Sequence, residues 1–457
     1  MPDFSSALWN KPTVTDDSDP VTRSLRFDNN AYLLKTGLSG STPSYGTISF
    51  WFKIGALPLA DVSSFYRIQD STGWLINQAM IDTNHVLNFN LYTDASNNNE
   101  WKSDQVFRDP SAWYHCCITH NADGSSDTIS ANSNSKVKIY INGELITGTS
   151  TVTGTDPVTI DAFRLPDSTN TSFQIGANGS NPREWQGLLA DFYYIEGSAV
   201  SSPVDYLIES TDYNSYKPKA FDMSSYSGNS FHLKFEDSAD IGADSANSND
   251  FSSYNISGTN DQLLDTPNKN YATLSPITNP QRDTLSQGNL SALYDSGGGS
   301  YCTVSTIGAS SGKWYFEVYR AGSNSGGVGV VNDLADFSSA IFQNGNNGVE
   351  LYRPLSSDST ADVYKNNAVT TNLSGDWTGS IVGVAFDADN GKIWFSNDGT
   401  WHGDPEDGTG QAETITLASY LFPAVRNSST ATTADIVNFG QDPTFAGNKT
   451  SGQDTSQ

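Results

Sequence analysis

The strongest constraint in this sequence is a pattern of alternating side chains on both sides of tight turns. In residues 136–148, apolar and polar residues alternate before and after Asn142-Gly143, a pair that supplies the two positive φ angles of a type I′ turn. Residues 381–401 repeat the pattern around Asp389-Asn390-Gly391. Such segments form β-hairpins, and comparable short runs occur along most of the chain. We therefore predict an all-β fold.

The length of the chain indicates more than one hydrophobic core. A single core stops growing at roughly 250–300 residues, and this chain has 457. The strand patterns fall into two stretches, so we predict two β-sandwich domains of the jelly-roll kind in tandem, with a short irregular connector. The expected order is an N-terminal arm (1–20), the first sandwich (21–206), the connector (207–270), the second sandwich (271–445) and a C-terminal tail (446–457).

Charge and composition exclude several classes of protein. Asp and Glu outnumber Lys and Arg by 51 to 24, which gives a formal net charge of −27. That charge repels phosphate backbones, so we expect no nucleic-acid partner. No run approaches about 18 apolar residues and residues 1–11 lack a secretory pattern, so we expect neither membrane insertion nor a signal peptide. The three cysteines, two of them adjacent at Cys116 and Cys117, predict buried thiols rather than a disulfide framework.

Five blocks in the first predicted sandwich follow one another in a recognisable order. They are residues 24–33 (SLRFDNNAYL), 46–53 (GTISFWFK), 113–115 (WYH), 139–145 (IYINGEL) and 173–176 with 185–197 (WQGLLADFYYIEG). Together these blocks resemble the laminin-G/concanavalin-A-like sandwich. The resemblance implies a lectin-like β-sandwich that presents loops for binding.

The second predicted sandwich resembles another family. Its blocks are residues 312–318 (GKWYFEV), 327–330 (GVGV), 383–398 (GVAFDADNGKIWFSND), 421–425 (LFPAV) and 437–440 (VNFG). This order is similar to that of a SPRY domain, and the resemblance implies variable loops that bind protein partners.

The segment between the sandwiches carries a third resemblance. Residues 217–221 (KPKAF), 231–237 (FHLKFED), 250–251 and 266–276 (TPNKNYATLSP) are similar to the linker of marine bacteriophage virion and tail-fibre-type proteins, which carry these two domains in this order. The resemblance implies a virion location, in a tail fibre, spike or head appendage. The implied partners are other virion proteins and a host cell-surface carbohydrate or receptor, and a homo-oligomer is expected, a trimer by analogy with fibres.

Two other functions are compatible with the same fold. One is a capsid-decorating or structural protein that contacts only other virion subunits. The other is a glycan-degrading enzyme, since this sandwich also hosts glycanases. Such hydrolysis needs two carboxylates facing one groove, and no Glu-x-Asp-x-Glu or Glu-x-Asp-x-x-Glu run is present. We therefore expect a non-enzymatic binding protein with no catalytic residues.

Aromatic residues in polar surroundings are the candidates for ligand binding. A sugar ring packs on an aromatic face while neighbouring Asn and Asp side chains bond its hydroxyl groups. The candidates in the first sandwich are Trp74, Tyr92, Trp101 and Trp185, with the amide of Asn77 nearby, and those in the second are Tyr352, Trp377 and Trp401. For each aromatic residue, packing in the core is the alternative interpretation.

Clusters of aspartate suggest a cation site. Ca²⁺ prefers carboxylate, amide and carbonyl oxygens in loops. The candidate ligands are Asp123 and Asp127 in the first sandwich, and Asp237, Asp240 and Asp244 in the connector. The alternative is that these residues stabilise turns exposed to solvent. No cofactor other than Ca²⁺ is expected.

Overall fold

The computed structural model confirms the all-β prediction. It describes residues 20–28, 30–38, 43–55, 57, 62–70, 73, 75–94, 97–124, 126–153, 171–176, 184–210, 215–278, 283–294, 301–321, 326–335, 347–353, 359–427 and 433–453. These form strands throughout apart from one short helix, α1 (Pro203–Tyr206). The described part of the chain contains no helix with the length and apolar character that a membrane crossing requires.

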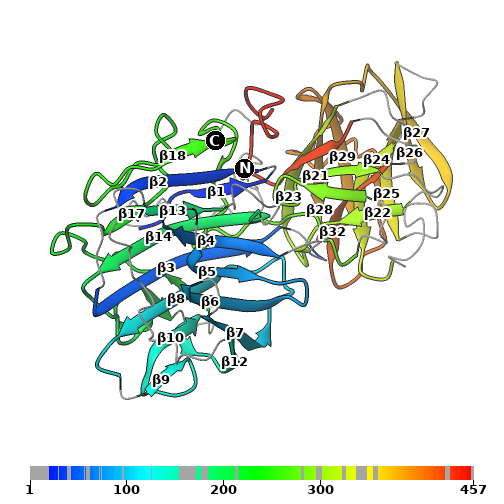
Figure 1. Cartoon of the computed structure of the whole chain (residues 1–457). Helices are drawn as coiled ribbons and strands as arrows, with labels where there is room; N and C mark the ends of the chain where they lie inside the picture. The colour runs from blue at the N-terminus through cyan, green and yellow to red at the C-terminus, as the bar shows by residue number, and fades with distance from the viewer. Residues whose placement is uncertain are drawn as a thin grey trace. The chain divides into compact units, whose positions relative to one another are not determined.

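The described residues form two compact units (Figure 1). The N-terminal unit contains residues 20–54 and 62–268, and the C-terminal unit contains the described residues from Lys269 onward. Each unit is built around two large sheets, so each is a β-sandwich, as predicted.

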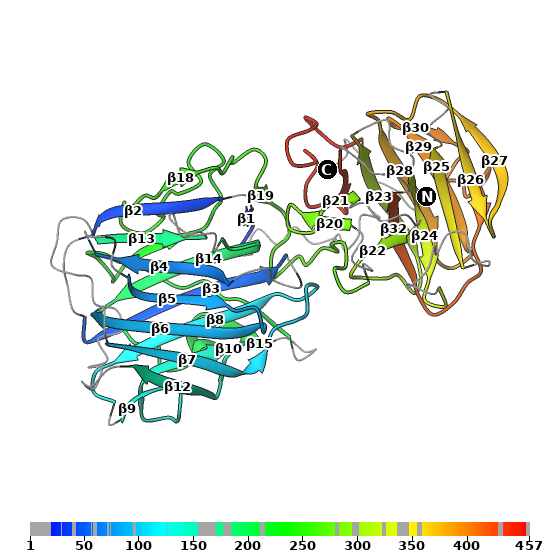
Figure 2. The same ribbon diagram turned by 45° about the vertical axis from the view of Figure 1, so that its right-hand side comes forward.

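The N-terminal unit has one sheet of eight strands and one of nine. Figure 2 shows the eight-stranded sheet edge to edge, in the order β12 (Gly148–Thr153), β7 (Asn97–Val106), β6 (Val86–Asp94), β5 (Leu75–Ile81), β4 (Ser63–Gln69), β13 (Thr171–Ile175), β2 (Tyr32–Leu38) and β18 (Ser252–Tyr254). The nine-stranded sheet has the order β11 (Glu144–Leu145), β10 (Ser135–Ile141), β8 (Tyr114–Asn121), β3 (Tyr45–Ile54), β14 (Gly187–Glu196), β1 (Ser24–Phe27) and β19 (Gln262–Leu263), with β17 (Phe231–Leu233) on β14 and β9 (Ser126–Ile129) on β10.

An aromatic core fills the space between these two sheets. The ring of Phe50 on β3 lies 4.9 Å from that of Phe65 on β4 and 5.1 Å from that of Phe192 on β14. Phe173 on β13 meets Phe192 edge to face. Because successive strand residues point to opposite faces, Trp51 and Lys53 of β3 point away from this core.

The outer face of the nine-stranded sheet is also buried. Trp51 and Tyr193 belong to a second apolar cluster together with Met223 and Leu263, which come from the segment that the sequence assigned to a connector. Three strands of that segment, β17, β18 and β19, pair with strands of the two sheets. The β15 (Ile208–Ser210) and β16 (Tyr216–Pro218) hairpin adds Ile208 to the cluster. Residues 207–268 are thus part of the N-terminal unit, because they cover apolar surface that would otherwise face water.

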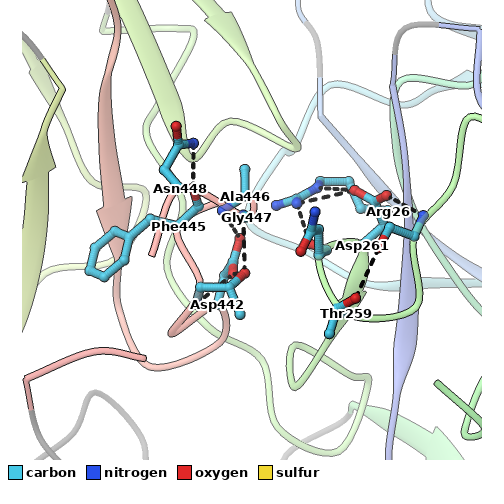
Figure 3. A network of polar contacts seen from close by, with 11 residues as sticks. Arg26, Thr259, Asp261, Asp442, Phe445, Ala446, Gly447 and Asn448 are labelled. Atoms are coloured by element: carbon cyan, nitrogen blue, oxygen red, sulfur yellow. Dashed lines mark hydrogen bonds and ion pairs between the residues drawn. The ribbon is translucent and has the colours of Figure 1, made fainter. Parts of the chain in front are cut away.

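A buried ion pair ties this covering segment to the sheet. The Lys53 ammonium lies 2.8 Å from a carboxylate oxygen of Asp265, and both side chains are almost fully buried. The indole of Trp113 donates to the other oxygen of Asp265 at 2.9 Å. In the same unit, the Arg26 guanidinium on β1 pairs with Asp261 at 3.2 Å (Figure 3). Lys53 is therefore tolerated in a buried position because Asp265 supplies its counter-charge.

The C-terminal unit also consists of two sheets. The first has the order β20 (Asp283–Ser286), β21 (Ser291–Tyr294), β33 (Asp435–Asn438), β23 (Lys313–Arg320), β28 (Ile381–Asp387), β29 (Lys392–Asn397) and β30 (Thr400–His402), with β31 (Glu413–Thr414) on β29. The second has the order β22 (Tyr301–Val304), β32 (Leu421–Asn427), β24 (Gly326–Asn332), β25 (Gly348–Arg353), β26 (Thr360–Lys365) and β27 (Ala368–Ser374).

The described part of the predicted C-terminal tail packs onto this unit. Asp442 accepts a hydrogen bond from the amide of Ala446 at 3.0 Å, which closes a turn visible in Figure 3. The amide of Gln453 donates to the buried carboxylate of Glu317 at 2.7 Å. Phe445, near the end of this turn, is fully buried. The described tail residues therefore belong to the sandwich.

Buried carboxylates give the C-terminal unit a predictable pH dependence. Burial, the largest effect, raises the pKa of Asp283 to about 6. A hydrogen bond from the Thr303 hydroxyl lowers this pKa, and the nearby carboxylate of Asp435 raises it. In the unfolded chain an Asp titrates near about 4, so between about pH 4 and 6 the folded state holds the proton more tightly. The free energy of unfolding should fall by about 2–3 kcal/mol as the pH rises through this window. Denaturant titrations at several pH values measure this fall.

The Asp283→Asn variant isolates the contribution of this group. It should unfold with a free energy that varies less between about pH 4 and 6 than that of the unmodified protein. The exposed Asp407 provides the control, and Asp407→Asn should leave the pH dependence unchanged. An Asp283→Asn protein with the full original pH dependence would contradict the assignment.

Candidate ligand-binding face

The outer face of the eight-stranded sheet includes side chains of β4 and β13 that point away from the aromatic core. Tyr66 and Phe173 point into the aromatic core, where their rings lie 5.5 Å apart. Their neighbours Arg67 and Gln174 therefore point to the opposite, outer face. The two residues are direct cross-strand partners, so the same face continues from one strand to the next.

Five polar side chains stand opposite one another across this face. Gln174 pairs with Arg67, Arg67 with Gln78, Gln78 with Asn90, and Asn90 with Glu100. We call these five residues the polar row. Neighbouring strands lie about 4.8 Å apart, so the row extends over roughly 19 Å. That length matches an extended ligand lying across the strands.

The centre of the polar row is screened from solvent. Gln78 has no exposed surface and Asn90 only 4 %. Within the described part of the chain, neither the oxygen nor the nitrogen of the Gln78 amide has a hydrogen-bond partner, and the oxygens of Asn90 and of its neighbour Asn88 lack one too. A buried amide without a partner costs about 1–3 kcal/mol. These amide atoms of the outer face therefore have hydrogen-bonding capacity that no other described residue satisfies.

The charged end of the row is more open. Glu100 lies 3.3 Å from the ammonium of Lys102, and the side chains are 39 % and 45 % exposed. The same ammonium is 3.8 Å from the carboxylate of Asp82. This end of the face therefore offers charges of both signs at the solvent boundary.

An aromatic pair marks the opposite edge of the same face. Tyr32 on β2 and Tyr254 on β18 are cross-strand partners whose rings stack 4.5 Å apart and nearly parallel. Tyr254 is 41 % exposed. Partial burial and the neighbouring Tyr254 raise the pKa of Tyr32, so it remains a neutral hydrogen-bond donor. Stacked rings at an edge provide an apolar platform beside the polar row.

The chemistry of this face suits the binding of hydroxyl-rich ligands. The amides of the polar row can both donate and accept hydrogen bonds, and the Arg67 guanidinium can donate them. Two carboxylates stand at the charged end of the face, Glu100 in the polar row and Asp82 near the ammonium of Lys102.

The ligand-binding residues predicted in the N-terminal unit lie partly on the outer face and partly in the interior. Tyr92 lies on β6 with its partly exposed side chain on the outer face, as the alternation with Asn90 requires. Trp101 and Asn77 lie on the inner side and are fully buried. Trp185 is 1 % exposed, with its ring 4.4 Å from that of Phe65. For these three residues the structure replaces the ligand-binding role with a packing role. Trp74 lies outside the described residues.

The candidates of the C-terminal unit do not form one site. Trp377 is 1 % exposed and stacks on His402, so it is a core residue and the surface role predicted for it is wrong. Trp401 is half-buried against Tyr315, with ring centres 5.8 Å apart. Tyr352 is partly exposed on the other sheet of the unit, where the Arg426 guanidinium lies 4.8 Å from its ring centre.

The Tyr352 ring lies beside a buried ion pair. Arg426 binds the two carboxylate oxygens of Glu350 at 2.9 and 2.6 Å. Burial raises the pKa of Glu350 and the guanidinium opposes that rise. This pair fixes the Arg426 side chain beneath Tyr352.

The predicted calcium ligands serve the backbone instead. Asp244 accepts hydrogen bonds from four amides, those of His232, Ala246, Asn247 and Asn249, at 2.8–3.0 Å. Asp237 caps the turn at Ala239.

The remaining aspartates do not converge on a common point. Asp123 accepts the hydroxyl of Tyr45, Asp240 is exposed, and the Asp127 side chain lies outside the described residues. Among the residues that the structure describes, no three His, Cys, Asp or Glu side chains come together as metal ligands.

The polar row contains no aromatic residue, so aromatic candidates in the sequence do not lead to it. The usable signal was the segment Val86–Asp94, in which Leu87, Phe89 and Leu91 alternate with Asn88, Asn90 and Tyr92. That alternation places two amides and a tyrosine on one face. Arg67 and Gln78 gave no such signal, because β-bulges interrupt the register of β4 with β5.

The unpartnered amides predict an unusual response to mutation. Replacing Gln78 with Met keeps the shape of the side chain but removes an unsatisfied amide. The free energy of unfolding should therefore stay the same or rise by up to about 2 kcal/mol. Thermal and denaturant unfolding measure this change.

Ser103 on β7 provides the matched control. Its buried hydroxyl accepts from the amide of Leu87 at 2.9 Å and donates to the carbonyl of Gln105 at 2.7 Å. Ser103→Ala should therefore lower stability by about 1–2 kcal/mol. A Gln78→Met protein destabilised as strongly as Ser103→Ala would show that the amide is structural.

Comparisons with known proteins agree with this architecture. Residues 27–201 match the model of the concanavalin A-like lectin/glucanases superfamily, and residues 313–441 match that of the SPRY domain. No curated protein gives a significant match to the chain.

Two solved structures of SPRY-type domains show similarity to part of this chain. The SPRY domain of human HERC1 has 18 % identity over 35 % of this chain and 91 % of its own, with a TM-score of 0.26. The TRIM65 PSpry domain has 16 % identity over 37 % of this chain and 90 % of its own, with a TM-score of 0.27. Domains of the laminin-G and SPRY types are typically non-catalytic binding modules. The chain therefore carries a concanavalin-A-like domain followed by a SPRY domain.

Proposed function

We propose that this chain is a non-enzymatic virion surface protein that binds a host glycan through the outer face of its concanavalin-A-like domain. The observation that carries the proposal is the buried centre of the polar row. Among the described residues, neither end of the Gln78 amide has a hydrogen-bond partner, and the Asn90 amide oxygen has none either. Hydroxyl groups of a sugar chain are the complement of such amides, since each hydroxyl both donates and accepts. The Tyr32–Tyr254 pair would pack against the apolar side of a sugar ring.

The virion setting rests on the resemblance of the segment between the domains to bacteriophage proteins. In that setting the protein would be a tail-fibre, spike or head-appendage subunit, and a homo-oligomer such as a trimer. Single lectin-like sites bind weakly, but several copies on one particle raise the overall avidity by roughly 10²- to 10⁴-fold. The SPRY domain would contact neighbouring virion proteins or a host receptor.

Removing the amides of Gln78 and Asn90 should weaken glycan binding without unfolding the protein. The double variant Gln78→Met/Asn90→Leu should lose binding to bacterial surface polysaccharides by at least roughly tenfold, since two hydrogen-bonding groups are lost. A glycan array with the purified full chain, followed by adsorption to cells that carry the best ligand, measures the loss. Glu209→Gln, at an exposed position on β15, is the control.

Other results would point to a different function. Undiminished binding by the double variant would show that the ligand contacts another surface. Binding to no polysaccharide, together with burial of the outer face against neighbouring subunits in the intact particle, would favour a purely structural role. Shortening of the bound polysaccharide would instead reveal a glycan-degrading enzyme.

A further inference from the structure

A pocket of about 420 Å³ lies on the opposite side of the N-terminal unit from the polar row. It is enclosed between the outer face of β14 and β17 and the covering segment that follows β16. Its lining residues are Pro20, Tyr193, Ala220, Phe221, Asp222, Met223, Ser224, His232, Lys234, Ser245 and Ala246. Ligand pockets in proteins span roughly 300–1,000 Å³, so this one accommodates a single small group.

A β-bulge builds the inner wall of the pocket. Asp191 on β14 adopts a positive φ of 54°, and the register with β3 shifts between Ala190 and Tyr193. The bulge directs the Asp191 carboxylate to the imidazole of His232, 2.7 Å away. It also brings the Tyr193 ring flat against that imidazole, with centres 3.8 Å apart. The wall is therefore rigid and aromatic.

Several polar groups of the pocket are already engaged. Besides the bond of His232 to Asp191, the carboxylate of Asp222 accepts the amide of Ser224 at 2.9 Å, and the Ser245 hydroxyl donates to the carbonyl of His232 at 3.0 Å. At the rim, the charges of Asp222 and Lys234 have opposite signs. A neutral ligand with few hydrogen-bonding demands fits these surroundings better than a sugar does.

The remaining surface is suited to an aromatic ring. The Phe221 ring stands edge to face with Tyr193 at 6.0 Å and is supported from behind by Tyr226 at 5.8 Å. Met223 adds a thioether, which makes favourable contacts with aromatic rings. A bound ring would thus find an aromatic edge, an aromatic face and a sulfur atom, with the ammonium of Lys234 at the opening.

We propose that this pocket receives an aromatic side chain of a partner polypeptide. The interface would be anchored by one tryptophan or tyrosine, buried in the pocket and surrounded by the polar rim of Asp222, Ser224 and Lys234, which is the usual arrangement of an anchoring contact. This inference does not depend on glycan binding, because the pocket and the polar row lie on different sheets of the unit.

The methionine content of the chain provides a direct test. There are three methionines; Met223 lines the pocket and Met80 lies opposite Asn88 on the outer face of the other sheet. The full chain labelled with ¹³C-methyl methionine therefore reports on both sites at once, with Met80→Leu and Met223→Leu used only to assign the signals. The probes are N-acetyl-tryptophanamide, N-acetyl-leucinamide and glucose, each titrated to about 50 mM, which would occupy a millimolar site.

The proposal expects a specific pattern of shifts. N-acetyl-tryptophanamide should move the Met223 methyl signal and leave Met80 in place, whereas glucose and N-acetyl-leucinamide should move Met223 little. Phe221→Leu keeps apolar bulk but removes the ring, and should weaken binding of the tryptophan probe by roughly 2- to 12-fold. Tyr420→Leu, at an exposed aromatic position in the C-terminal unit, should bind it normally.

Three outcomes would overturn the proposal. One is a Met223 signal that does not respond to the tryptophan probe, and another is unchanged affinity in Phe221→Leu. The third is a Met223 shift with glucose in place of the tryptophan probe, which would make the pocket a sugar site. A glucose shift confined to Met80 would support the glycan-binding face and leave the test of the pocket to the tryptophan probe.

Discussion

The N-terminal unit depends on the buried ion pair between Lys53 and Asp265. Lys53 lies on β3, in the middle of the nine-stranded sheet, where an unpaired ammonium would be prohibitively costly. Asp265 lies more than two hundred residues later in the chain, and Trp113 holds its second oxygen. Breaking such a pair on one side typically costs about 3–5 kcal/mol, because the remaining charge stays buried. The pair therefore specifies where the covering segment docks.

This docking determines the character of both outer faces of the unit. Residues 207–268 cover the nine-stranded sheet, and several residues of that sheet that point away from the core, such as Trp51 and Tyr193, are aromatic. The eight-stranded sheet receives only β18, at its edge, and its outer face carries the polar row. The pocket therefore lies between the nine-stranded sheet and residues 207–268, whereas the polar row lies on the outer face of the eight-stranded sheet. The two proposed contacts, with a glycan and with a polypeptide, follow from this difference.

Much of the fold was predictable from the sequence, and much less of the candidate site. The hairpins at Asn142-Gly143 and Asp389-Asn390-Gly391 could be predicted because the residues of the turn themselves determine its type. The sequence of β3 alternates, which puts Lys53 on the face opposite Phe50 and Phe52, but nothing local indicates that residues 207–268 cover that face. Trp101 has polar neighbours in the sequence, but alternation along β7 directs its ring into the core. Trp185 precedes β14 and packs against Phe65, a contact that no local pattern indicates.

Native-state hydrogen exchange on the full chain tests the central claim most directly. If residues 207–268 are part of the N-terminal unit, the amides of β17 and β19 should exchange as slowly as those of β14, and in Asp265→Ala the amides of β19 should lose that protection first. Fast exchange in β17 and β19 of the unmodified protein, beside a protected β14, would show that the segment is a loose connector and would contradict the account.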